Sequence, residues 1–290
     1  MIGFLISLLI ASQIINPLSE FAARLPANSD FSMPKRKMTA SFEPIVQAKS
    51  AVVVDSVTNE ILFEKNSLEP RSIASITKLM TAIVFLEAKH SFDKMVQVTE
   101  DDKENGGRAE ITPGEIIKTE NLFNAALIGS INNAAYELSF ATDLSYADFI
   151  KNMNNKSKEI GMKNTFFYEP TGISSRNKST ARDLVLLLQY ALEKKEIKDA
   201  LAKQNYYFES LNGQKHFIES TNELLGSYLG SVGGKTGYTD EAGYCFVNMV
   251  DGKDGKNRLV TVVLGAKTKE DRFQENKFLT QWVMDNWAWE

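Results

Sequence analysis

The sequence has few of the residues that the commonest catalytic sites need. It contains one cysteine, Cys245, and two histidines, His90 and His216. One cysteine cannot form an internal disulfide, and with two histidines it cannot complete a zinc site of the Cys/His type. Neither histidine stands in a recognisable triad setting, whereas a serine activated by a lysine needs no histidine. We therefore expect no metal and no other cofactor.

The chain also lacks an excess of charge of one sign. Its 33 basic and 37 acidic residues give a formal charge of -4 without a long run of either sign, so no electrostatic footprint for nucleic acid is visible. Its 290 residues are 43% hydrophobic and 10% aromatic, which is ample for a packed core. We expect one large or two modest globular domains that do not bind nucleic acid.

The N-terminus carries an apolar stretch, Ile2–Ile15, that is short for a membrane span and suits the core of a signal peptide. No Lys or Arg precedes it, and residues 21–23 match a cleavage site poorly, so an uncleaved anchor is the alternative to a cleaved signal peptide. A buried N-terminal helix is a third interpretation. We expect a signal peptide or membrane anchor in residues 1–23, a linker in 24–46, and the globular domain in 47–290.

Periodicity predicts an α+β fold in that domain. Strands, helices, strands and a last helix follow one another along the chain, and the main expected elements are strands 51–55, 60–64, 244–250 and 258–266, a buried helix 75–89, and helices 122–140, 180–193 and 270–287. This order predicts an antiparallel sheet built from both chain ends, packed by helices, with an inserted helical lobe. A cleft between sheet and lobe is the natural place for a site.

The first candidate motif is Ser75-Ile76-Thr77-Lys78 at the start of the buried helix. The spacing puts a hydroxyl and an amine on one face within a turn, where a partly desolvated lysine can take the proton of the serine. Alone, the pattern fits an N-cap serine with a solvated lysine equally well.

The second motif, Ser130-Ile131-Asn132, lies between two helical stretches and supplies another hydroxyl and an amide. Ser130 could relay a proton to a leaving amine, and Asn132 could hold a substrate carbonyl. An ordinary polar turn before a helix would have the same composition.

The third motif, Gly234–Thr239, is expected just before a strand. Lys235 offers a fixed positive charge to a terminal carboxylate, Thr236 adds a hydroxyl, and the glycines let a substrate backbone approach. A phosphate-binding P-loop is the rival interpretation. It needs four residues between its first glycine and Gly-Lys-Thr, and Gly230 leaves three.

Together, the motifs S-x-x-K, S-x-N and K-T-G, in this order and separated by 55 and 105 residues, match the penicillin-recognising serine enzymes. With ASITKLMT at 74–81 and NTFFYEPTG at 164–172, the chain closely resembles low-molecular-mass D-alanyl-D-alanine carboxypeptidases over residues 48–286. The resemblance implies a β-lactamase/transpeptidase-like fold, extracytoplasmic action on peptidoglycan stem peptides, and covalent inhibition by β-lactams.

The resemblance also implies roles. Ser75 would be the acylated nucleophile, Lys78 its base and Ser130 the proton relay, while substrate would be bound by Asn132, Lys235, Thr236, Gly237 and Tyr238. The backbone N–H groups of Ser75 and Tyr238 would form the oxyanion hole. The bond cut would be the one before the last D-alanine of the stem.

Two departures from the family pattern stand out. Many relatives carry a C-terminal β-rich domain and an anchoring helix, whereas this chain ends at Glu290 after the core, so we expect no such domain and any anchor at the N-terminus. Where relatives commonly have Ser-Gly-Asn-Asp, this chain has Ile131 and Asn133 in the corresponding loop.

Three alternatives stay open. An endopeptidase would cut the cross-links between stems instead of the stem end. A β-lactamase would use Glu169 to activate a deacylating water, although Glu169 lacks the leucine-asparagine pair that should follow it. An inactive wall-binding module would keep the fold, but we expect such a module to have lost at least one of the candidate groups.

Overall fold

The computed structural model describes residues 33–38, 42–99, 111–252 and 257–289. These ranges all belong to one compact unit. The expected signal or anchor in residues 1–23 therefore lies outside the described residues. Within the described ranges, no helix has the length and apolar character needed to cross a membrane.

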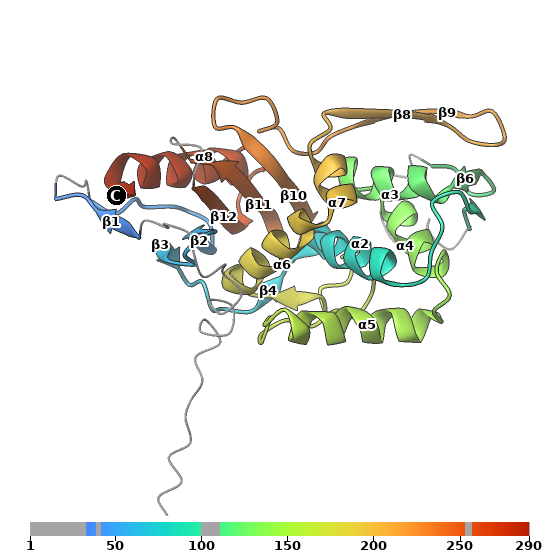
Figure 1. The fold of residues 1–290 in the computed structure, drawn as a ribbon, viewed down its shortest axis with the longest axis horizontal. Helices are drawn as coiled ribbons and strands as arrows, with labels where there is room; N and C mark the ends of the chain where they lie inside the picture. The colour runs from blue at the N-terminus through green and yellow to red at the C-terminus, as the bar shows by residue number, and fades with distance from the viewer. Residues whose placement is uncertain (1–32, 39–41, 100–110, 253–256, 290) are drawn as a thin grey trace, which may run out of the picture. The chain divides into compact units, whose positions relative to one another are not determined.

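A five-stranded antiparallel sheet forms the centre of this unit, and its strands come from both ends of the sequence (Figure 1). In spatial order they are β10 (Ser231–Thr239), β11 (Gly243–Asp251), β12 (Arg258–Ala266), β2 (Ser50–Asp55) and β3 (Ile61–Lys65). The expected hairpins are both present, because β2 pairs with β3 and β11 pairs with β12. The α+β architecture predicted from the sequence is confirmed.

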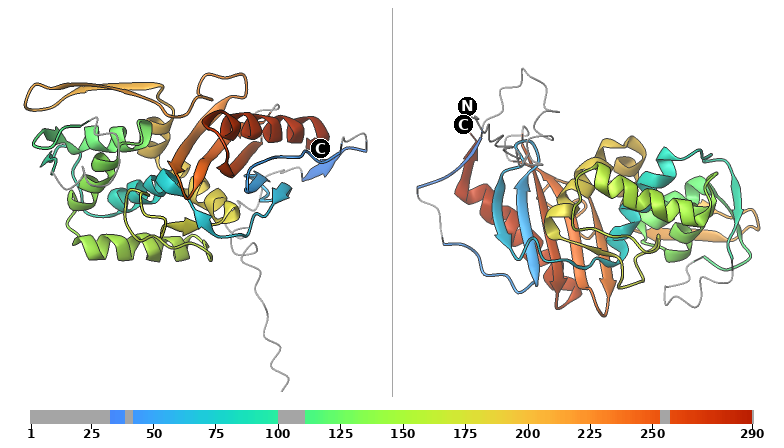
Figure 2. Two further views of the ribbon diagram at one scale, coloured as in Figure 1. Left: turned by 180° about the vertical axis from the view of Figure 1, so that it is seen from behind. Right: turned by 90° about the horizontal axis from the view of Figure 1, so that it is seen from below.

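Helices cover both faces of the sheet, as the right-hand view of Figure 2 shows. The C-terminal helix α8 (Lys269–Asn286) packs on β11 and β12, and α6 (Ala181–Glu193) packs against β2, β11 and β12. Because both faces are covered, β2 is buried along its whole length and reads as an apolar run instead of an alternating pattern. Thr180 caps α6 by accepting a hydrogen bond from the backbone of Asp183.

The remaining helices form a lobe inserted between β3 and β10. They are α2 (Lys78–Glu87) with the short 3-10 helix η1 (Ala74–Thr77) before it, α3 (Thr119–Ile128), α4 (Asn132–Phe140), α5 (Tyr146–Glu159) and α7 (Lys195–Leu201). Helix α2 lies at the centre of the lobe and is buried from Lys78 to Phe85, which confirms the buried helix expected from its apolar circumference. The helical stretch 122–140 is two helices, separated at the S-x-N motif.

Short strand pairs complete the structure, and none of them was predicted. They are β1 (Pro34–Arg36) with β13 (Trp287–Trp289), β4 (Arg71–Ser72) with β7 (Lys178–Ser179), β5 (Met95–Gln97) with β6 (Ile116–Lys118), and β8 (Asn205–Glu209) with β9 (Lys215–Glu219). In the described part of the stretch expected to be a linker, 24–46, strand β1 pairs with the C-terminal strand β13.

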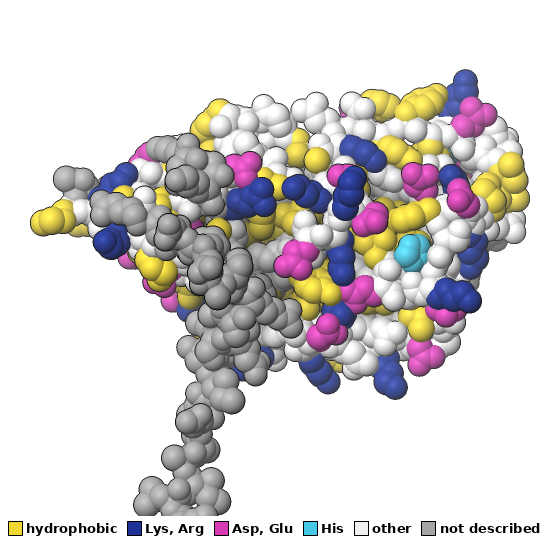
Figure 3. Space-filling model, in the orientation of Figure 1, with side chains coloured by type: hydrophobic (Ala, Val, Ile, Leu, Met, Phe, Trp, Pro, Cys, Tyr) yellow, Lys and Arg dark blue, Asp and Glu magenta, His cyan; other side chains and the backbone are white. Residues whose placement is uncertain are grey.

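The surface carries charges of both signs. On the face shown in Figure 3, Lys and Arg side chains are interspersed with Asp and Glu. This mixture agrees with the balanced composition of the sequence.

Candidate active site

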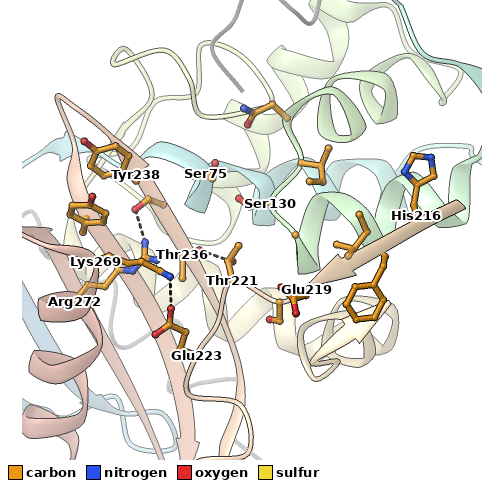
Figure 4. Close-up of a pocket in the computed structure, with 18 of the residues that line it drawn as sticks. Ser75, Ser130, His216, Glu219, Thr221, Glu223, Thr236, Tyr238, Lys269 and Arg272 are labelled. Atoms are coloured by element: carbon orange, nitrogen blue, oxygen red, sulfur yellow. Dashed lines mark hydrogen bonds and ion pairs between the residues drawn. The ribbon is translucent and has the colours of Figure 1, made fainter. Parts of the chain in front are cut away.

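The three motifs meet at one cleft between the sheet and the helical lobe, with a cavity volume of about 860 Å³. Its lining includes, from the sequence-predicted set, Ser75, Ser130, Asn132, Thr236, Gly237 and Tyr238. Lys78 and Lys235 lie directly beneath, each with its Nζ on one of the lining serines. Figure 4 shows Ser75 and Ser130 close together in this cavity, opposite the strand that carries Tyr238.

Ser75 is held by an unusual local backbone. It lies in η1, and the preceding Ala74 has φ of 47°, a left-handed conformation that is uncommon for a residue with a Cβ. Gly172 (φ +90°) fits underneath, since a Cβ there would lie 2.0 Å from the carbonyl oxygen of Ala74. Strain of this kind persists only where the surroundings enforce it, and it is frequent at functional sites.

Lys78 begins α2 and points its amine at Ser75. Its Nζ lies 2.8 Å from Ser75 Oγ, 2.7 Å from Asn132 Oδ1 and 2.6 Å from the carbonyl oxygen of Thr171. The side chain is only 1% exposed. Burial lowers the pKa of Lys78 to about 7, although the negative charge of Glu169 partly opposes this shift.

Ser130 lies in the loop after α3, and Asn132 is the first residue of α4. Ser130 also adopts a left-handed backbone, with φ of 63°, and its Oγ accepts a 2.7 Å hydrogen bond from Lys235 Nζ. Because the Oδ1 atom of Asn132 accepts from Lys78, its amide NH2 is left to donate to a ligand. Hydrogen bonds thus connect Ser75, Lys78 and Asn132 into one polar group, and Ser130 with Lys235 into another.

Strand β10 forms the opposite side. The K-T-G motif lies inside this strand and not before it, which corrects our expectation and excludes a P-loop, since a P-loop leads into a helix. A Cβ on Gly237 would lie 2.8 Å from the carbonyl oxygen of Ile73 and 3.1 Å from the backbone nitrogen of Ser75. Only a glycine therefore lets β10 approach the nucleophile so closely.

Lys235 is as buried as Lys78, at 1% exposure. Burial and the positive charges of Lys78 and Arg272 hold the pKa of Lys235 well below its usual range. The sequence suggested that Lys235 carries a fixed positive charge. With a lowered pKa its protonation state can instead change, and an anion that enters the cleft favours the charged form.

Glu169 is fully engaged in a turn beneath the cleft. Its carboxylate accepts hydrogen bonds from the backbone of Thr171, Gly172 and Ser174, and from the side chains of Thr171 and Asn177. The carboxylate of Glu169 therefore has a structural role, because its oxygens hold the Pro170–Gly172 turn, whose Thr171 carbonyl contacts Lys78.

Arg272 and Thr221 are among the polar residues of the cleft that were not anticipated. Arg272, on α8, is 5% exposed and donates to the carbonyl oxygen of Gly237 at 3.3 Å. Thr221, after β9, hydrogen-bonds Thr236 through the two hydroxyls at 2.7 Å. Neither belongs to a motif, and only the tertiary structure brings them to the site. The β8–β9 hairpin that precedes Thr221 did have a signal, since Asn212-Gly213 is a strong hairpin turn.

Comparisons with known proteins agree with the resemblance inferred from the motifs. A family model described as D-alanyl-D-alanine carboxypeptidase, peptidase S11, matches residues 37–268. The chain is 33% identical over 252 residues to the D-alanyl-D-alanine carboxypeptidase DacF of Bacillus subtilis, covering 85% of this chain and 64% of that relative. It is 37% identical over 203 residues to a D-alanyl-D-alanine endopeptidase of Haemophilus influenzae, covering 69% of each.

Solved structures give the same result for the fold. Penicillin-binding protein D2 from Listeria monocytogenes, in a cefotaxime-bound form, aligns with a TM-score of 0.74 at 34% identity, over 84% of this chain and 99% of that one. The Streptomyces K15 DD-transpeptidase aligns with a TM-score of 0.77 at 25% identity, over 84% of this chain and 100% of that one. The transpeptidase-like fold expected from the resemblance is confirmed, and the chain belongs to the D-alanyl-D-alanine carboxypeptidase family, peptidase S11.

Proposed function

We propose that this protein is a serine-type D-alanyl-D-alanine carboxypeptidase that removes the last D-alanine from peptidoglycan stem peptides through an acyl-enzyme on Ser75. The observation that carries the proposal is the 2.8 Å contact between Ser75 Oγ and the buried amine of Lys78. A lysine with a pKa of about 7 has a large neutral fraction near pH 7, so it can accept the serine proton.

Three oxygen atoms surround the amine of Lys78: Ser75 Oγ, Asn132 Oδ1 and the carbonyl oxygen of Thr171. In the neutral form, two N–H groups can donate to Asn132 and Thr171, which leaves the lone pair to accept the hydroxyl proton of Ser75. Ser75 Oγ then attacks the carbonyl carbon of the penultimate D-alanine. The N–H groups of Ser75 and Tyr238 stabilise the oxyanion, and the Asn132 amide holds the preceding carbonyl of the substrate.

Collapse of the tetrahedral intermediate breaks the C–N bond. Ser130, hydrogen-bonded to Lys235, relays a proton to the leaving nitrogen. The carboxylate of the leaving D-alanine lies at Lys235 and Thr236, with Arg272 as a further cation beside them. Water then hydrolyses the ester and releases Ser75. No step needs a metal or a cofactor.

β-Lactams should acylate the same serine. The Listeria relative is described in cefotaxime-bound and ampicillin-bound forms. Rapid hydrolysis of the adduct needs a carboxylate that is free to activate water, and the oxygens of Glu169 are occupied by the turn that they hold. We therefore propose slow release of penicillin and not β-lactamase activity. The intact contacts of Ser75, Lys78, Ser130 and Lys235 likewise argue against an inactive wall-binding module.

Family membership implies action at the cell wall, on the outer side of the cytoplasmic membrane. We propose that residues 1–23 direct or anchor the protein there, that residues 24–46 connect them to the catalytic domain, and that the domain itself comprises residues 47–290. The mass of the N-terminus of protein isolated from membranes and from soluble fractions tests whether the apolar segment is retained.

The decisive experiment combines labelling with product analysis. Purified protein should be labelled by a fluorescent penicillin and should convert a stem pentapeptide to a tetrapeptide plus D-alanine, whereas Ser75→Ala should do neither. Equal labelling of Ser75→Ala would place acylation on another residue. Absence of both activities in the wild type would remove the proposed function.

A further inference from the structure

A cluster of buried polar residues adjoins the start of α2, and none of its members is a candidate catalytic residue. The cluster consists of Thr77, Thr81, Glu169, Thr171 and Asn177. Four of them are at most 5% exposed, and Glu169 is partly buried. Burying polar side chains costs free energy unless they are hydrogen-bonded, so the contacts of this cluster should account for its position.

Asn177 is the centre of the cluster and is 0% exposed. Its Oδ1 accepts hydrogen bonds from the backbone N–H groups of Tyr168, at 2.7 Å, and Glu169, at 3.2 Å. Its Nδ2 lies 3.1 Å from Thr77 Oγ1, 2.9 Å from the carbonyl oxygen of Glu169 and 2.8 Å from Glu169 Oε1. The donors and the acceptor of the amide are thereby all used. One side chain thus joins η1 to the residues that lead into the Pro170–Gly172 turn.

The main chain of Asn177 holds the segment before the nucleophile. Its carbonyl oxygen accepts a hydrogen bond from the backbone N–H of Ile73, at 3.3 Å. This contact extends the pairing of β4 with β7 by one residue toward Ser75. Because Ser75 lies between Ile73 and Thr77, Asn177 fixes the chain on both sides of the nucleophile.

The Pro170–Gly172 turn is attached to α2 at two points. The side chain of Thr81 donates to the first carbonyl of the turn, at 2.5 Å. The amine of Lys78 lies 2.6 Å from the oxygen of the second, which is that of Thr171. The carboxylate of Glu169 holds this second carbonyl in place, because it accepts from two backbone N–H groups of the turn at 2.6 and 2.7 Å. A chain of hydrogen bonds thus runs from the cluster to the acceptor of Lys78.

The position of the Thr171 carbonyl determines where the amine of Lys78 points. A lysine side chain is flexible, and fixing it costs up to about 2 kcal/mol of conformational entropy. In the neutral amine, two N–H groups can donate to the Thr171 carbonyl and to Asn132 Oδ1, and these two bonds direct the lone pair toward Ser75. If the Thr171 carbonyl moved, the amine could rotate and the serine would lose its proton acceptor.

The charges around Lys78 add a second effect. The negative charge of Glu169 raises the pKa of Lys78, against the larger lowering by burial. Lys235, on β10, is a second cation coupled to Lys78. Glu137 on α4 and Asp183 on α6 are buried carboxylates of two helices that pack on α2, and each accepts from the backbone of another segment. Replacing Glu169 by an uncharged residue therefore lets the amine lose its proton at a lower pH.

We propose that Asn177 and Glu169 are positioning residues for the catalytic base, Lys78. They hold the Thr171 carbonyl oxygen in place, and this contact keeps the amine of Lys78 aimed at Ser75. This inference rests on the proposed function. Neither residue belongs to one of the three motifs, and the described lining of the cleft contains neither. Both act through Lys78, and the hydroxyl proton of Ser75 still passes to Lys78 as the ester forms.

The test measures the second-order rate constant for acylation by a fluorescent β-lactam between pH 5 and 9. Glu169→Gln removes the charge, Glu169→Asp keeps it, and Asn177→Ala removes the side-chain hydrogen bonds at the centre of the cluster. Asp183→Asn is the matched control. Asp183 is 5% exposed and also accepts from a backbone N–H and a threonine hydroxyl, but its partners among the described residues lie outside the Pro170–Gly172 turn. Thermal unfolding of each variant measures its loss of stability.

We expect Glu169→Gln to move the midpoint of the pH profile lower by about one pH unit, because the charge that favours the protonated amine is gone. The rise in rate from pH 5 to 7 should then shrink from about 50-fold to about tenfold. Glu169→Asp should keep the midpoint of the wild type. Asn177→Ala should lower the rate at pH 8 by at least about tenfold, since the base loses its orientation. Asp183→Asn should lower the unfolding temperature and leave the rate and the midpoint unchanged.

A purely structural role predicts a different result, in which the variants lose stability as Asp183→Asn does but keep the pH profile of the wild type. An unshifted midpoint in Glu169→Gln, or a wild-type rate in Asn177→Ala, overturns the inference and leaves the proposed function intact. If Asn177→Ala does not fold, the profile of Glu169→Gln alone decides. A wild type that is not acylated at any pH removes the proposed function itself.

Discussion

The lowered pKa of Lys78 predicts how the acylation rate depends on pH. If Lys78 is the base, acylation requires its neutral form, and a pKa of about 7 makes that form about 1% of the enzyme at pH 5, half at pH 7 and nearly all at pH 9. The acylation rate should therefore rise about 50-fold from pH 5 to 7 and only about twofold from 7 to 9. A lysine with its ordinary pKa of 10.5 would give a rise of about tenfold per pH unit across the whole range.

The assay is the second-order rate constant for acylation by a chromogenic or fluorescent β-lactam, measured by stopped flow. Lys78→Arg is the control, because a guanidinium stays charged. We expect its acylation rate to be about 10²–10⁴ lower than that of the wild type and no longer to rise between pH 5 and 7. A wild-type rate that is constant from pH 5 to 9, or that climbs tenfold per unit up to pH 9, would refute the role of Lys78 with a depressed pKa.

Three further substitutions test the packing and polar contacts of the site. Gly237→Ala places a Cβ 3.1 Å from the backbone nitrogen of Ser75, so acylation by penicillin should slow at least about tenfold, and an unchanged rate would show that β10 adjusts freely. Glu169→Gln removes acceptors that hold the turn, so it should lower the free energy of unfolding by about 1–3 kcal/mol in thermal or urea unfolding. It should not create penicillin turnover, and fast turnover by the wild type or the variant would restore the lactamase interpretation. Thr221→Val removes the hydrogen bond to Thr236 and should raise KM for the pentapeptide about three- to tenfold with a smaller effect on kcat, whereas Thr221→Ser should restore it.

The sequence alone determined the chemistry of this protein to a large extent. The S-x-x-K spacing sufficed to put Ser75 and Lys78 within one turn, because helical geometry is local. The order of the three motifs identified the family, and the periodicity and order of the expected elements predicted the helix-packed sheet and the buried helix α2. With two histidines and one cysteine, the chain cannot build a zinc site of the Cys/His type, and neither histidine stands in a recognisable triad setting.

Other features could be decided only by the tertiary structure. The depressed pKa of Lys78 depends on burial beneath the cleft, and the contact between Ser130 and Lys235 joins residues 105 positions apart. Arg272 reaches the site from the last helix, where no local pattern marks it. The β8–β9 hairpin had a turn signal, but the sequence could not tell that β9 would line the cleft. That position depends on the fit of Ile218 against Gly129, a packing contact between segments far apart in the chain.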